Sequence, residues 1–90
     1  MYIMMNLHKE ITQYLSFCSL QKALSKHTIK AYRIDLTQFE KHKPNIAFNR
    51  EAINSYIEYL HTSFKPKTVR RKIATLKAFA HYLYYHDKID

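Results

Sequence analysis

Glycine does not occur anywhere among the 90 residues of this chain. Average glycine usage of about 7% would give roughly six glycines in a chain of this length. Glycine is the residue that takes positive φ most readily, and the tight turns of β-hairpins need positive φ. The only two prolines, Pro44 and Pro66, fall between segments of helical periodicity. The composition therefore predicts an all-α fold.

Apolar residues recur every three or four positions in four segments, which is the spacing of an amphipathic helix. The expected helices cover about residues 7–20, 26–42, 50–62 and 66–86. We expect a single domain, a compact orthogonal bundle of four or five helices with one core. The expected core residues are Ile29, Tyr32, Leu36, Ile53, Leu60, Ile73, Leu76 and Leu83.

The predicted helix ends carry recognisable capping residues. Asn6, Ser25 and Asn49 stand where an N-cap side chain would accept a backbone hydrogen bond. Pro66 suits the first turn of the fourth helix, where a missing N–H costs nothing. Pro44 ends the second helix, because the residue before a proline avoids helical backbone angles.

Two positions on the fourth helix depart from its apolar stripe. Phe79 is placed at the edge of the stripe. Lys72 falls between Phe79 and Leu83, so we expect its stem to line the core rim with its ammonium in water. The single cysteine, Cys18, lies on the stripe of the first helix and is expected to be a small buried hydrophobe rather than a nucleophile.

The chain is strongly basic, with 15 Lys and Arg against 7 Asp and Glu, a net charge of +8 and a pI near 9.7. Such a charge favours a polyanionic partner, with nucleic acid ahead of an anionic membrane surface. The alternative is a basic domain whose charge only keeps it soluble. No apolar run approaches the roughly 20 residues that span a bilayer, and no signal peptide is visible, so a cytoplasmic protein without a membrane partner is expected.

Two segments place bases beside an apolar stripe at the start of a helix, residues 25–33 and 65–73. Side chains there can reach a base edge while the helix end faces phosphate. Two ordinary solvated faces are the alternative interpretation. Arg71 is the expected base reader, because its angle on the helix differs from those of its basic neighbours. The candidate DNA contacts are Lys26, His27, Thr28, Lys30, Arg33, Lys67, Thr68, Arg70, Arg71 and Lys77.

No catalytic or cofactor site is predicted. The six histidines and one cysteine form no pair with metal-ligand spacing, since His81 and His86 lie about 140° apart on a helix. The seven carboxylates are scattered, and without glycine there is no phosphate-binding loop. The tyrosines at 82, 84 and 85 are expected to pack or to form an interface.

Two motifs resemble those of a known family. Residues 24–39 read Leu-Ser-x-x-Thr-Ile-x-x-Tyr-Arg-x-Asp-Leu-x-x-Phe, and residues 67–83 read Lys-Thr-Val-Arg-Arg-Lys-Ile-x-x-Leu-x-x-Phe-x-x-Tyr-Leu. Both, in this order, resemble the SAM-like core-binding domain of tyrosine recombinases, the phage-integrase family. The resemblance runs from about Leu7 to Ile89.

The resemblance implies half of a C-shaped clamp around duplex DNA, with the second and fourth helices in or across the major groove. It assigns DNA contacts to His27, Thr28 and Lys30, and on the fourth helix to Lys67, Thr68, Arg70 and Arg71. It gives the first helix a contact with a neighbouring protomer in the synaptic complex.

The resemblance also puts the catalytic residues in a following domain, so none of the eight tyrosines is expected to be the nucleophile. The chain ends about where a linker to that domain would begin, which suggests an excised domain or a truncated gene. Two other functions stay open: a helical SAM-type protein-interaction module with an acidic partner, and a free-standing DNA-binding regulator.

Overall fold

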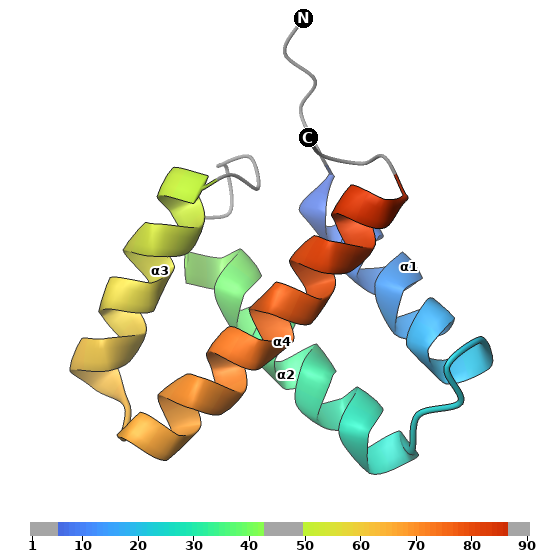
Figure 1. Cartoon of the computed structure of the whole chain (residues 1–90), viewed down its shortest axis with the longest axis horizontal. Helices are drawn as coiled ribbons and strands as arrows, with labels where there is room; N and C mark the ends of the chain where they lie inside the picture. The colour runs from blue at the N-terminus through green and yellow to red at the C-terminus, as the bar shows by residue number, and fades with distance from the viewer. Residues whose placement is uncertain (1–5, 43–49, 87–90) are drawn as a thin grey trace, which may run out of the picture.

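The computed structural model describes residues 6–42 and 50–86, which form four α-helices and no strand (Figure 1). The all-α prediction is confirmed, and the described residues hold no fifth helix. No helix within these two ranges is both long and apolar enough to cross a membrane. The helices are α1 (Leu7–Leu20), α2 (Lys26–His42), α3 (Arg50–Ser63) and α4 (Pro66–Tyr85).

The helices begin where the capping residues predict. The side chains of Asn6 and Ser25 each accept a hydrogen bond from the backbone N–H three residues later, both at 3.1 Å. Each bond satisfies one of the N–H groups that a helix start leaves open. Pro66 occupies the first turn of α4. The predicted helix end at Pro44 and the cap at Asn49 lie outside the described residues.

The turn between α1 and α2 takes positive φ without glycine. Ala23 has φ 51°, and it is the only residue with positive φ in the part of the chain that the structure describes. The turn is held by the N–H of Leu24, which donates to the carbonyl of Cys18 at 3.1 Å. A residue with a Cβ pays about 1–2 kcal/mol for this conformation.

Helices α2 and α4 cross one another, and the other two helices pack around this pair. In Figure 1, α2 runs from lower right to upper left and α4 from lower left to upper right. Helix α1 packs against both, and α3 packs against α4. As a result, α2 and α4 both begin at the lower edge of the molecule in this view.

One hydrophobic core joins the four helices, as predicted. Among the expected residues, Leu36, Leu60, Leu76 and Leu83 are buried, and the others are half-buried and pack against them. The half-buried members are Ile29, Tyr32, Ile53 and Ile73. Cys18 is 0% exposed on the apolar side of α1. The helical periodicity therefore placed these eight residues on the inward faces correctly.

Two expectations about α4 are wrong. Phe79 lies in the centre of the core at 0% exposure rather than at the edge of the stripe. The ammonium of Lys72 is not in water: its side chain is 5% exposed, and its Nζ lies 2.9 Å from a carboxylate oxygen of Asp35. The same Nζ also lies 5.2 Å from the centre of the Phe64 ring. A helical wheel of α4 cannot reveal this partner, because Asp35 comes from α2.

Candidate nucleic-acid interface

The first turns of α2 present three cations beside a shallow hollow. Lys26, Lys30 and Arg33 are all exposed, as their shared arc on the helix predicts. The hollow measures about 230 Å³ and is lined by these three residues with Ser19, Leu24 and Ile29. A concave surface with three positive charges suits a phosphate group better than a neutral ligand.

The other two candidates on α2 differ in exposure. His27 is exposed, whereas Thr28 is half-buried and takes part in the helix cap. The Ser25 hydroxyl donates to Thr28 Oγ1 at 3.1 Å, and the N–H of Thr28 donates back to Ser25 Oγ at 3.1 Å. Thr28 therefore has a structural task at the start of α2 besides its predicted DNA contact.

The start of α4 is basic as well. Lys67 and Arg70 are exposed, the Arg71 side chain is 53% exposed, and Thr68 is half-buried. Lys65, the N-cap residue, makes no side-chain hydrogen bond to the first turn. Open N–H groups at a helix start attract anions. This end of α4 therefore combines side-chain cations with the positive end of the helix dipole.

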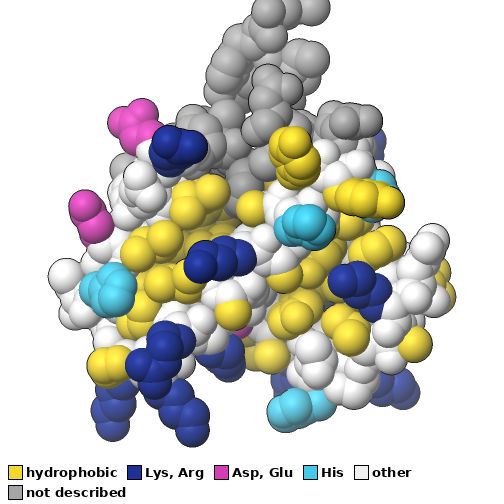
Figure 2. Space-filling model, in the orientation of Figure 1, with side chains coloured by type: hydrophobic (Ala, Val, Ile, Leu, Met, Phe, Trp, Pro, Cys, Tyr) yellow, Lys and Arg dark blue, Asp and Glu magenta, His cyan; other side chains and the backbone are white. Residues whose placement is uncertain are grey.

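The fold brings the two basic helix starts to the same edge of the molecule. Figure 2 shows many of the Lys and Arg side chains along the lower edge, where α2 and α4 begin in Figure 1. The most exposed Asp and Glu side chains on this face lie at its upper left. Lys77 is exposed but stands about 15 Å further along α4 than Lys67. Nine of the ten predicted contacts thus lie in the first turns of the two helices, and Lys77 does not.

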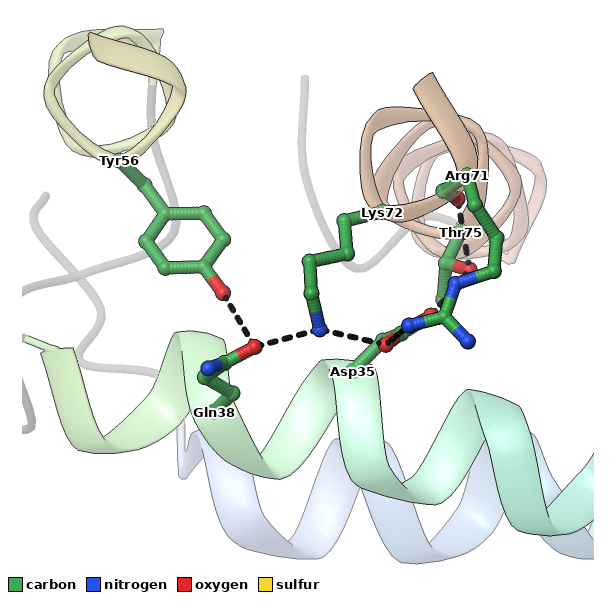
Figure 3. A network of polar contacts seen from close by, with 6 residues as sticks. All are labelled: Asp35, Gln38, Tyr56, Arg71, Lys72 and Thr75. Carbon is green, nitrogen blue, oxygen red and sulfur yellow. Dashed lines mark hydrogen bonds and ion pairs between the residues drawn. The ribbon is translucent and has the colours of Figure 1, made fainter. Parts of the chain in front are cut away.

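A polar network that the sequence did not predict lies where α2 and α4 cross, in the middle of the molecule (Figure 1 and Figure 3). Asp35 of α2 is at its centre, with a side chain only 2% exposed. Its Oδ1 accepts hydrogen bonds from Arg71 Nη2 and Lys72 Nζ, both at 2.9 Å. Its Oδ2 accepts one from the Thr75 hydroxyl at 3.1 Å. Three residues within two turns of α4 therefore hold one carboxylate of α2.

The network continues to α3 through Gln38. Gln38 Oε1 accepts a hydrogen bond from Lys72 Nζ at 2.6 Å and one from the Tyr56 hydroxyl at 3.4 Å. Two signals in the sequence point to this arrangement. Lys72 stands inside an apolar stripe, and Asp35 stands about 40° from Phe39 at the edge of another. A lysine and an aspartate placed this way indicate a buried pair between helices.

Comparison with known proteins decides the family. Residues 11–86 match the family described as phage integrase, N-terminal SAM-like domain. The match covers far more than half of the chain, including both basic helix starts and the network between them.

The chain belongs to the phage-integrase N-terminal domain family.

Relatives of this phage-integrase domain are tyrosine recombinases. The chain is 47% identical over 89 residues to a tyrosine recombinase of Agathobacter rectalis, covering 96% of this chain and 29% of that protein. It is 36% identical to tyrosine recombinase XerC of Staphylococcus saprophyticus, covering 77% of this chain and 25% of that protein. It is 34% identical to tyrosine recombinase XerD of Rickettsia conorii, covering 81% of this chain and 26% of that protein. The chain therefore spans less than a third of the length of these relatives. No solved structure gives a significant match.

The buried tyrosines of this integrase domain are held in their neutral form. Burial raises the pKa of Tyr56 to about 12, and it raises the pKa of Tyr14 further. Burial also raises the pKa of Tyr82 and of the Cys18 thiol. A phenol or thiol with a raised pKa is a poor nucleophile near neutral pH.

Metal ligands are not assembled either in the part of the domain that the structure describes. Residues 6–42 and 50–86 contain no group of three His, Cys, Asp or Glu side chains that could hold a metal ion. The two histidines His81 and His86 border one aromatic pocket, but they come without a third ligand.

Proposed function

We propose that this chain is the DNA-binding domain of a site-specific tyrosine recombinase, which holds the duplex of the recombination core site. The observation that carries the proposal is that two basic helix starts lie along the same edge of a phage-integrase domain. The relatives named as tyrosine recombinases support the recombination role.

The physical basis of binding is charge neutralisation along the phosphate backbone. The chain has a net charge of +8, and the cations at the starts of α2 and α4 are exposed. Each lysine or arginine that neutralises a phosphate releases condensed counterions, which favours binding at low salt. The two helix starts would grip the duplex at separate points, as one half of a clamp.

Strand cleavage would belong to a following domain of the parent recombinase. Burial raises the pKa values of Tyr56, Tyr14 and Tyr82, so each of these phenols stays neutral and is a poor nucleophile near neutral pH. The chain alone should therefore form no covalent adduct with DNA. A protein–DNA adduct through the exposed Tyr84 or Tyr85 would contradict this part of the proposal.

The test is a titration of a labelled duplex with the chain at several salt concentrations. We expect a dissociation constant of about 10⁻⁴–10⁻⁶ M at physiological salt, and a slope of log affinity against log salt near −4.5 if roughly five phosphates are neutralised. K30A on α2 and R70A on α4 should each lower the affinity and make the slope shallower by about one unit.

K9A is the matched control, because Lys9 is an exposed cation near the start of α1, at the opposite edge of the molecule. It should leave the slope unchanged. If the double variant K30A/R70A bound duplex as tightly as the wild type, the protein-interaction function with an acidic partner would be the better explanation of the two basic faces.

A second proposal concerns contact with another protomer through α1. A pocket of about 390 Å³ lies between the end of α1 and the end of α4, with Phe17, Tyr82 and Tyr85 among its lining residues. Tyr85, which lines the pocket, is 75% exposed, and Leu20, the last residue of α1, is 79% exposed. An apolar surface of this kind suits a protein contact.

The protomer contact is tested by the cooperativity of binding to a duplex long enough for two copies. We expect L20Q/Y85Q to bind the first copy like the wild type and the second copy less cooperatively. Equal cooperativity of the variant and the wild type would remove α1 from the assembly surface.

A further inference from the structure

We propose that Asp35 is a positioning residue for DNA binding: it holds the Arg71 guanidinium at the crossing of α2 and α4 in the orientation in which Arg71 contacts DNA. The inference rests on the proposed function, since it assigns a role within the same surface. Asp35 itself is buried and would touch no DNA.

The carboxylate of Asp35 is fixed from several sides. Both of its oxygens accept hydrogen bonds, Oδ1 from Arg71 and Lys72 at 2.9 Å and Oδ2 from Thr75 at 3.1 Å. Its side chain is 2% exposed, so water does not compete for these bonds. A carboxylate held this way provides a rigid anchor for any group that binds to it.

The Arg71 guanidinium binds the Asp35 carboxylate through one terminal nitrogen, and the side chain is partly exposed to solvent. Its Nη2 donates to Asp35, while the second terminal nitrogen points away from the carboxylate (Figure 3). Its side chain is 53% exposed. A guanidinium has five N–H donors in a fixed plane, so the pinned Nη2 also sets the direction of the remaining donors.

Holding the Arg71 side chain in place should improve DNA binding, because it reduces the entropy that the side chain loses on binding. An exposed arginine that moves freely loses rotamer freedom when it binds DNA, and an arginine already held in place does not. Lys72 makes this arrangement compatible with a polyanionic partner. Its ammonium neutralises the charge of Asp35 within the core, so the positive charge of Arg71 stays available at the surface.

The test is a double-mutant cycle between Arg71 and the buried pair. D35L/K72M removes the anchor and its counter-charge together, and it leaves the net charge at +8 because one anion and one cation are lost. The polar groups around the pair keep partners: the Thr75 hydroxyl lies 3.2 Å from the Arg71 carbonyl, and Tyr56 still bonds Gln38. Replacing a buried ion pair by apolar residues often preserves stability.

Affinity for a labelled 20-bp duplex is measured at low salt in both backgrounds, after circular dichroism has shown that each variant is helical. We expect R71A to lower the affinity about tenfold in the wild type and less than twofold in D35L/K72M. R33A is the matched control: Arg33 is an exposed arginine of α2 outside the network, and its loss should cost the same factor in both backgrounds.

D35N provides a third background, which keeps an oxygen acceptor for Arg71. In D35N, the loss of affinity caused by R71A should lie between the losses in the wild type and in D35L/K72M. An equal effect of R71A in both backgrounds would overturn the positioning role, and so would an R71A variant that binds like the wild type. Failure of the wild-type chain to bind any duplex would instead refute the proposed function itself, so the two failures are distinguishable.

Discussion

Because Lys72 and Asp35 form a buried ion pair, we expect their single substitutions to lower the free energy of unfolding by different amounts. D35L leaves the ammonium inside the core with only the Gln38 carbonyl and the Phe64 ring beside it. Removing one partner of a buried ion pair typically costs about 3–5 kcal/mol. For a domain of this size, this corresponds to a fall in melting temperature of about 12 °C or more.

K72M should cost less, because the carboxylate of Asp35 keeps its bonds to Arg71 and Thr75. The variant loses the two hydrogen bonds of the ammonium, to Asp35 and Gln38, but it no longer buries a charge, so the net loss should be about 1.5–3 kcal/mol. The double variant D35L/K72M leaves no unpaired charge in the core and should lie within about 1 kcal/mol of the wild type.

Urea denaturation followed by circular dichroism gives the three free energies of unfolding. The decisive comparison is between D35L and the double variant, since the second substitution should restore most of the stability lost in the first. If D35L alone cost less than about 1 kcal/mol, the ammonium of Lys72 would be reaching water, and the buried pair would not exist in solution.

Three other outcomes are expected. L76A should lower the free energy of unfolding by about 2–5 kcal/mol, because Leu76 is 4% exposed and its truncation leaves a cavity; a loss below roughly half a kilocalorie in urea denaturation would place it at the surface. A23G should stabilise the domain by up to about 1 kcal/mol in the same assay. Glycine takes the positive φ of position 23 without strain, but it loses more backbone entropy on folding, which offsets part of the gain. A clear destabilisation would mean that the strain is absent. The raised pKa of Tyr56 means that its stabilising contribution is complete below pH 10 and is lost as the pH rises towards about 12. Y56F should therefore lose less stability than the wild type over this alkaline range in urea titrations, and parallel losses would contradict the burial of the phenol.

The sequence alone determined the secondary structure and the inward faces of the helices. The absence of glycine, the caps at Asn6 and Ser25 and the proline at 66 are local features, and they act within one turn of the chain. Apolar spacing is local too, which is why Leu36, Leu60 and Leu76 could be placed in the core. The family also followed from the sequence, because its motifs lie along α2 and α4.

Only the tertiary structure decided what happens where the helices meet. A helical wheel treats each helix separately, so it placed the ammonium of Lys72 in water and Phe79 at the edge of the stripe. The crossing of α2 and α4 puts Asp35 opposite Arg71 and Lys72, which lie 36 and 37 positions later in the chain. Whether a charged side chain is buried depends on the partner that the fold brings to it, because a buried charge is tolerated only with its counter-charge and hydrogen bonds in place.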